Sequence, residues 1–217
     1  MCGAISRVET RVGVHVLIHR HEQCKPSSTG SLIVRAVADA RCHVYQRESP
    51  FFRRSGFAPA SVSSERPLWI LHPGGEPLPS AAGPAAALSR PQVLLIDGTW
   101  RQAGEMLRTV EGMGRVVRLP EQEQEQERSR YWLREHATPT HVSTAEALIR
   151  VFRAVGDPAS EHRLRLHFEL HVYAMLLARG RREMAERYLG HSPLLVEVPE
   201  VLERLHQRRL PLPDRRQ

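Results

Sequence analysis

The stretch Val93-Leu94-Leu95-Ile96-Asp97-Gly98-Thr99-Trp100 gives the clearest indication of the fold. Four consecutive aliphatic residues are typical of a short strand that is covered on both faces. The residues from Trp100 to Val110 are mostly helix formers, so a helix is expected to follow this strand. Asp97 therefore falls at the carboxyl end of a buried strand.

Four further apolar segments have the length and pattern of strands. Valines at positions 12, 14 and 16 alternate with other residues before Leu17 and Ile18, which predicts a strand entering buried surroundings. The expected strands are Arg11–His19, Cys42–Gln46, Leu68–Leu71 and Val116–Val117. The sequence His72-Pro73-Gly74-Gly75-Glu76 is expected to end the third of them in a turn.

Capping signals place helices between and after these strands. Ser27, Ser28 and Thr29 offer a cap for the helical segment at residues 32–40, and Ser143-Thr144-Ala145-Glu146 is a capping box. The helix that it opens should stop at Gly156-Asp157-Pro158. A further helix is expected from about Ser160 to Arg179, and a shorter one after Gly180. Loops are expected at 47–67 and in the segment up to Pro91. The acidic run at 121–127 is expected to be solvated, and the end at 208–217 to be loosely ordered.

Strands that alternate with helices predict an α/β fold, in which helices flank a mainly parallel sheet and further helices follow at the C-terminus. We expect an N-terminal segment at 1–10, a main domain at 11–190 and an arginine-rich tail at 191–217. Ligands of such sheets bind beyond the carboxyl ends of the strands. The loops at 19–31, 72–76 and 97–100 are therefore expected to share one edge.

The composition favours a soluble protein and is compatible with a polyanionic partner. The 217 residues include 31 Lys and Arg against 24 Asp and Glu, and Lys25 is the only lysine. Arginine binds phosphates and stacks on bases, which makes RNA a plausible partner, although a genome rich in arginine codons gives the same bias. No apolar run approaches the roughly 20 residues of a membrane span, so we expect no membrane contact and a cytoplasmic location.

Asp97 is the first candidate for chemistry. At the rim of an apolar wall, desolvation would raise its proton affinity, which suits a general base. It can equally be the N-cap of the helix that follows. Gly98 permits close backbone approach, and amides at the helix start can hold an anion. Trp100 offers a flat face to a nucleobase or a cationic sulfonium, with ordinary core packing as the alternative.

Other kinds of site find little support. A metal site is suggested by His15, His19, His21, His72, Glu22 and Cys24. These residues form no HxxxH pattern on a helix and include no cysteine pair, so no metal is expected. Cys2, Cys24 and Cys42 are interpreted as free thiols. No GxGxxG, Walker or GxSxG pattern follows a strand, which argues against dinucleotide binding, NTP hydrolysis and the α/β-hydrolase mechanism.

Four blocks, taken in order, resemble the DTW-domain family, the tRNA-uridine aminocarboxypropyltransferases. The blocks are His19-Arg20-His21-Glu22 with Lys25-Pro26 and Ser28-Thr29-Gly30; Leu71-His72-Pro73-Gly74; Leu95-Ile96-Asp97-Gly98-Thr99-Trp100-Arg101-Gln102-Ala103; and Ser143-Thr144-Ala145-Glu146-Ala147. The third block is the most specific. The match spans about residues 12 to 155.

The resemblance implies a fold related to the knotted SPOUT-like domains, with S-adenosylmethionine as donor. The reaction that it implies is transfer of the donor's 3-amino-3-carboxypropyl group to N3 of a tRNA uridine, with release of methylthioadenosine. Asp97 would accept the N3 proton as the general base. The donor is expected to contact His72, Pro73, Gly74, Thr99, Trp100 and Thr144, although Thr144 and Glu146 can equally act only as helix caps.

The expected phosphate contacts are Arg20, Lys25, Arg101, Arg130 and Arg134. The chain departs from the family in two places. It lacks the N-terminal cysteine cluster that members often carry, and Ser28-Thr29-Gly30-Ser31 stands where the family has Asn-Thr-Gly-Arg. These departures bear on RNA recognition, and no obligate protein partner is indicated, so a monomer is expected.

Two other functions remain open from the sequence. A SPOUT-type methyltransferase would use the same donor but leave a methyl mark on the RNA, which mass spectrometry of tRNA distinguishes. A non-catalytic RNA-binding module would not bind S-adenosylmethionine, which calorimetry tests.

Overall fold

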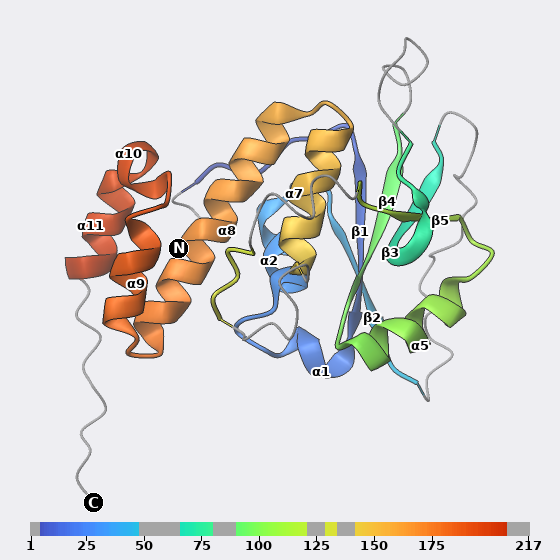
Figure 1. Ribbon diagram of the computed structural model, residues 1–217, viewed down its shortest axis with the longest axis horizontal. Helices are drawn as coiled ribbons and strands as arrows, with labels where there is room; N and C mark the ends of the chain where they lie inside the picture. Colours follow the sequence, from blue (N-terminus) through green and yellow to red (C-terminus); the bar gives the residue numbers. More distant parts are fainter. Residues whose placement is uncertain (1–4, 48–65, 80–89, 121–128, 134–141, 208–217) are drawn as a thin grey trace, which may run out of the picture.

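Five parallel strands form one sheet in the order β2-β1-β4-β3-β5 (Figure 1). The computed structural model describes residues 5–47, 66–79, 90–120, 129–133 and 142–207. The strands are β1 Gly13–His19, β2 Arg41–Tyr45, β3 Leu68–Pro77, β4 Gln92–Asp97 and β5 Arg115–Arg118. The predicted α/β fold with a parallel sheet is confirmed, whereas the knotted path stays a prediction.

Helices cover both faces of the sheet. The helices α2 Thr29–Ala36 and α7 Thr144–Ala154 pack on one face, with α8 Pro158–Ala178 packed against them, and α5 Trp100–Val110 packs on the other face (Figure 1). Residues of β4 alternate between the two layers, because Val93 and Leu95 join the core under α2, α7 and α8 while Leu94 joins the core under α5. The apolar run at 93–96 is therefore a strand with both faces covered, as predicted.

The register of the three central strands aligns their carboxyl ends. Ile18 of β1 is opposite Asp97, and Leu71 of β3 is opposite Leu95. The end of β1, the end of β4 and the residues after Leu71 therefore lie at one edge of the sheet. This is the edge at which parallel α/β sheets bind their ligands.

The third strand differs from the prediction. His72–Gly75 was expected to end it in a turn, but β3 continues to Pro77 and pairs with β5. The register shifts inside this segment, since both Leu71 and Glu76 are opposite Val117. Residues 72–75 thus form an irregular bulge within a strand, which proline and glycine permit because a bulge leaves the ladder.

The helix starts follow their capping residues. Ser28 caps α2, which ends at Ala36, and Ser143 with Glu146 forms the predicted capping box of α7. A short helix that the sequence did not indicate, α1 Arg20–Gln23, follows β1 directly. The predicted break after α7 is confirmed, because Asp157 caps α8 and Gly156 adopts a positive φ of 68°.

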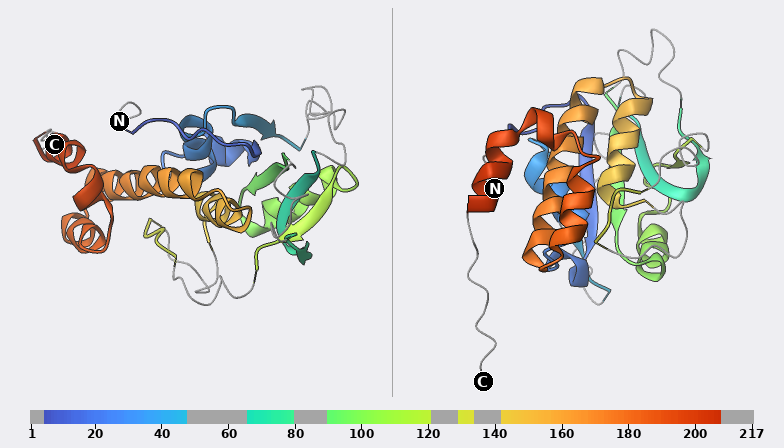
Figure 2. Two further views of the ribbon diagram at one scale, coloured as in Figure 1. Left: turned by 90° about the horizontal axis from the view of Figure 1, so that it is seen from above. Right: turned by 60° about the vertical axis from the view of Figure 1, so that its left-hand side comes forward.

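Three helices follow α8 at the end away from the sheet (Figure 2). They are α9 Arg182–Leu189, α10 Leu194–Glu197 and α11 Pro199–Gln207. The segment 191–217 was expected to be a tail, but Leu194, Val201 and Leu202 are buried, so α10 and α11 belong to the folded part. The acidic run at 121–127 and the end at 208–217 lie outside the described residues.

Candidate active site at the carboxyl edge of the sheet

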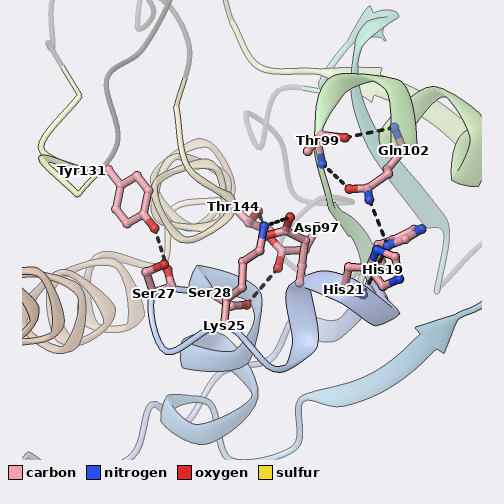
Figure 3. Close-up of polar contacts among 11 residues, drawn as sticks. His19, His21, Lys25, Ser27, Ser28, Asp97, Thr99, Gln102, Tyr131 and Thr144 are labelled. Carbon is pink, nitrogen blue, oxygen red and sulfur yellow. Dashed lines mark hydrogen bonds and ion pairs between the residues drawn. The ribbon is translucent and has the colours of Figure 1, made fainter.

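Asp97 lies at the centre of a buried hydrogen-bond network at this edge (Figure 3). Its side chain is only 8% exposed. Ser28 Oγ donates to Oδ2 at 3.0 Å, and Thr144 Oγ1 donates to Oδ1 at 2.5 Å. The carboxylate therefore joins the end of β4 to the N-termini of α2 and α7, and hydroxyl groups fix the orientation of both its oxygens.

The start of α2 is shaped to approach this carboxylate closely. Ser28 serves twice, because its Oγ also accepts a hydrogen bond from the Ser31 amide and so caps the helix. A methyl group on Gly30 would lie 2.6 Å from Oδ2 of Asp97 and 2.7 Å from its Cγ. Glycine at position 30 is thus needed because Asp97 occupies the space of a side chain.

The start of α7 supplies the second hydroxyl. Ser143 caps this helix, and its own backbone amide donates to Oε2 of Glu146 at 2.7 Å. Oε1 of Glu146 accepts from the backbone amide of Arg130, also at 2.7 Å. Glu146 is therefore committed to the cap and to the 129–133 segment, while Thr144 is free of the capping bonds and points to Asp97.

The start of α5 shows whether Asp97 is the N-cap of this helix, one of the two interpretations left open by the sequence. Thr99, not Asp97, is the N-cap: its Oγ1 accepts from the Gln102 amide, and Gln102 Oε1 accepts from the Thr99 amide at 2.8 Å. The helix-cap interpretation of Asp97 is therefore wrong. The next residue, Trp100, is 56% exposed, so its indole is not part of the core.

On the α5 side of the same edge, His19 ends β1. Its Nδ1 accepts from the Gln102 Nε2 at 3.1 Å and from the His21 amide at 3.3 Å. Its ring packs edge-on against His21 and lies beside Tyr45. Burial and the neighbouring His21 lower the pKa of His19 below its usual value. The neutral imidazole is therefore the ordinary state of His19.

The expected donor-binding residues His72, Pro73 and Gly74 lie at this edge, within β3. His72 follows the last residue of β3 that pairs with β4. Its Nδ1 accepts from the Gly74 amide at 3.1 Å, and burial lowers its pKa. Pro73 and Gly74 are exposed. Part of this segment is therefore exposed to solvent within the bulge of β3.

The basic residues expected to bind phosphate occupy different environments. Arg20 on α1 and Arg101 on α5 are exposed. Lys25 is about half exposed, and its Nζ lies 2.6 Å from Oε1 of the buried Glu22. Arg134 lies outside the described residues.

Arg130 is built into the protein instead. Its Nε and one terminal nitrogen donate to the two carboxylate oxygens of Glu169 at 3.0 and 2.7 Å. Its guanidinium also stacks 4.0 Å from the centre of the Tyr188 ring. Burial alone would lower the pKa of Arg130, but the bonds to Glu169 and the contact with Tyr188 raise it above the usual value. These contacts with Glu169 and Tyr188 conflict with the phosphate contact that was expected of Arg130.

A cavity of about 240 Å³ lies beside this ion pair, between α7, α8 and the turn before α10. It is lined by Arg130, Glu146, Ile149, Arg150, Arg165, Phe168, Glu169, His191 and Pro193. Arg130 and Glu169 pair with each other, and Arg165 reaches Glu161 at 3.2 Å. Much of its charged lining is therefore already paired, and we assign the cavity no ligand.

The described residues also bear on metal binding, on the cysteines and on membrane spans. Within these residues, no group of three or more His, Cys, Asp or Glu side chains is placed to hold a metal ion. Cys24 and Cys42 are free and exposed. No helix in the same part of the chain is long and apolar enough to cross a membrane.

The model of one protein family, the DTW domain, matches residues 1–176. The chain belongs to the DTW domain family. Membership of the DTW domain family supports a tRNA-modifying function for this protein. No solved structure gives a significant match to the chain. The matched region ends just before the end of α8, so α9 to α11 lie beyond it.

The structure adds residues to which the sequence assigned no role in the candidate site. Ser28 and Gly30 were quoted within the first motif, but their contacts with Asp97 depend on how α2 meets β4. Gln102 had a signal in the sequence, because a threonine followed three residues later by glutamine is a capping-box pattern. In this DTW-domain protein Ser28 also shows that serine, in place of the family's asparagine, still caps α2 and reaches Asp97.

Proposed function

We propose that the protein transfers the 3-amino-3-carboxypropyl group of S-adenosylmethionine to N3 of a uridine in tRNA, with release of methylthioadenosine. One observation supports this most strongly. Three of the four sequence blocks of the family meet at one buried carboxylate, since Ser28 and Gly30 come from the first block, Asp97 from the third and Thr144 from the fourth. A tRNA-modifying family and a single shared site point to the same residues.

The residues at this edge suit the proposed donor. S-adenosylmethionine supplies a positively charged sulfonium, whose bond to the γ carbon breaks with the electron pair leaving on a neutral thioether. An exposed indole favours a cation nearby, and Trp100 provides it. In this proposal Thr99, Thr144 and the segment His72, Pro73 and Gly74 contact the rest of the donor.

Asp97 acts as the general base in this proposal. It accepts the proton of N3 as N3 forms its bond to the γ carbon. Thr144 and Ser28 hold the carboxylate in place and are positioning residues.

Exposed basic residues would bind the tRNA backbone. Arg20 and Arg101 lie at the two sides of the edge, on α1 and α5, and Lys25 follows α1. Arginine donates in a fork that matches phosphate oxygens. We leave Arg130 out of this surface because Glu169 and Tyr188 already hold its guanidinium.

The direct test uses purified protein, total tRNA and two forms of the donor, one labelled in the carboxypropyl group and one in the methyl group. The proposal expects label in tRNA only from the first form, and 3-amino-3-carboxypropyl uridine in nucleoside mass spectrometry. Label from the methyl form alone would replace the proposal with methyl transfer. No label together with no binding of the donor in calorimetry would indicate a non-catalytic RNA-binding module.

A further inference from the structure

We propose that His19 presents a neutral Nε2–H group to an acceptor oxygen of the bound substrates, and that Gln102 is the positioning residue that fixes this tautomer. The inference rests on the proposed function, because it assigns the group to the same site. It adds a hydrogen-bond donor to a site whose proposed general base, Asp97, is an acceptor.

The cap determines which way the Gln102 amide points. The Thr99 backbone amide is a donor only, and it lies 2.8 Å from Oε1 of Gln102. The oxygen must therefore face Thr99. The amide nitrogen then faces the other way and lies 3.1 Å from Nδ1 of His19 (Figure 3). Because an amide NH₂ can only donate, Nδ1 of His19 must accept.

A second contact also indicates that Nδ1 of His19 is an acceptor. The backbone amide of His21 also points to Nδ1 of His19, at 3.3 Å. Two donors thus meet one ring nitrogen, and neither of them can accept. In a neutral imidazole with Nδ1 as acceptor, the proton resides on Nε2. The tautomer of His19 is set by the start of α5 and the start of α1 together.

The surroundings also keep the ring neutral. A second proton would have to sit on Nδ1, against the two donors. Burial, His21 and Lys25 lower the pKa of His19. The carboxylates of Glu105 and Glu22 act in the opposite direction and raise it. Tyr45, from β2, packs against the ring and hydrogen-bonds to Glu105. The net direction is downward, so at neutral pH His19 donates through Nε2 without carrying charge.

His19 stands at the edge where the substrates are proposed to bind. It follows Ile18, the residue of β1 that is opposite Asp97. The two side chains lie on opposite faces of the sheet, His19 beside α5 and Asp97 beside α2 and α7, and His19 is partly exposed. A substrate that lies across the edge between α1 and α5 meets a donor on one side and an acceptor on the other.

An N–H group at this position fits an oxygen that carries or gains negative charge. As N3 of a uracil loses its proton, charge spreads to the ring carbonyl oxygens, and a fixed donor stabilises that charge. The carboxylate of the donor's amino-acid part has the same chemistry. Both are acceptor oxygens, and the experiment separates them.

The first variant changes the tautomer and leaves the cap in place. Glu at position 102 can still accept from the Thr99 amide, since threonine followed by glutamate is a standard capping box. Its other oxygen accepts, so Nδ1 of His19 must now carry a proton. The pKa of His19 rises, and above this raised pKa the proton on Nε2 is lost.

Imidazole ¹⁵N NMR should therefore show the Nε2–H tautomer in the wild type and a protonated Nδ1 in Gln102→Glu. The transfer rate of Gln102→Glu should fall at least tenfold as pH rises through the new pKa of His19, while the wild type shows no such fall. Gln46→Glu, which adds the same charge just after β2, should behave as the wild type. A wild-type spectrum with the proton on Nδ1 would overturn the assignment, whether or not tRNA is modified.

The second pair of variants tests whether the N–H group is used. His19→Gln keeps an N–H donor near the position of Nε2, whereas His19→Leu removes it. We expect His19→Leu to lose on the order of 10²-fold in kcat/KM, and His19→Gln to recover most of this loss. Equal, near-normal turnover in both variants would show that the group has no role.

Calorimetry with S-adenosylmethionine and methylthioadenosine identifies the oxygen. If His19→Leu weakens binding of S-adenosylmethionine but not of methylthioadenosine, which lacks the carboxylate, the oxygen belongs to the donor. If both bind normally and only kcat falls, it belongs to the uracil. Failure of the proposed function itself would appear in the wild type, as absence of the carboxypropyl product, and is thus distinct from either outcome.

Discussion

Asp97 and Glu169 are both buried carboxylates, 8% and 3% exposed, yet the protein holds them in different ways. Glu169 on α8 receives a two-pronged bond from the guanidinium of Arg130. Asp97 receives hydroxyl groups from Ser28 and Thr144 at the starts of two helices. One carboxylate is bound by a cation that only donates, and the other by groups that can both donate and accept.

This difference indicates which carboxylate can take up a proton during a reaction. A guanidinium has no acceptor atom, so protonation of Glu169 would break its pairing with Arg130. A hydroxyl can rotate and accept, so Asp97 can gain a proton and keep hydrogen bonds to Ser28 and Thr144. The Arg130–Glu169 pair is therefore built for structure, and the Asp97 network is suited to a change of charge.

The largest expected effect comes from Asp97→Asn. The substitution removes the base but keeps the shape, and positioned general bases contribute about 10²- to 10⁴-fold in rate. We expect a loss of that order in transfer to tRNA, with calorimetric affinity for S-adenosylmethionine largely retained. The hydroxyls can reorient to the amide, so the free energy of unfolding should fall by only about 1 kcal/mol. Near-normal turnover in this variant would remove Asp97 from the mechanism.

The second effect concerns stability. Arg130→Ala leaves the carboxylate of Glu169 buried without its cation, which costs about 3–5 kcal/mol in comparable pairs. Urea unfolding should show this loss, whereas Arg187→Ala, an exposed arginine on α9, should change stability by less than about 0.5 kcal/mol. If Arg130→Ala is as stable as the wild type and instead loses tRNA affinity, Arg130 binds phosphate as the sequence first suggested.

Much of the fold could be predicted because its signals are local. The apolar run at 93–96 and the capping box at Ser143 depend on neighbouring residues only, and both are confirmed. The bulge at 72–75 was misjudged because proline and glycine resemble a turn, while the pairing that extends β3 to Pro77 depends on β5, more than 35 residues later in the chain. Helices α10 and α11 were missed because they are short and gain their order from burial against the rest of the chain.

The candidate site could be predicted only at its centre. The position of Asp97 at a strand end follows from the sequence, and its family motif named it. Whether it capped α5 did not follow, because Asp97 and Thr99 are both good caps two residues apart, and Thr99 forms the box with Gln102. The role of Arg130 was hidden for a similar reason, since its partner Glu169 is 39 residues away.

A smaller effect tests how tightly α2 is fitted to Asp97. Gly30→Ala places a methyl group 2.6 Å from Oδ2 of Asp97, and such overpacking typically costs about 1–3 kcal/mol. The helix or the carboxylate must move, so the transfer rate should fall along with stability. Gly104→Ala on α5 is the matched control, because nothing lies within 4 Å of the added methyl, and a helical glycine to alanine change there should stabilise by about 0.5–1 kcal/mol. Equal behaviour of the two variants would mean that α2 does not press on Asp97.

The smallest expected effects concern the exposed arginines, which we expect to differ in their contribution to tRNA binding. Arg20 and Arg101 are exposed on α1 and α5, where Arg→Gln should leave the free energy of unfolding unchanged and weaken tRNA binding a few-fold. Each loss of a phosphate contact should also reduce the slope of log affinity against log salt by about 1. Arg187→Gln on α9, at the end of the molecule away from the sheet (Figure 2), is the control and should leave both the affinity and the salt slope unchanged.

If all three variants lowered affinity equally, tRNA would be attracted by net charge alone, and the edge that carries Asp97 would not be a specific binding site for the phosphate backbone. A reduced slope for Arg20 and Arg101 alone would instead place the RNA across α1 and α5, where its bases can reach the carboxyl ends of β1 and β4.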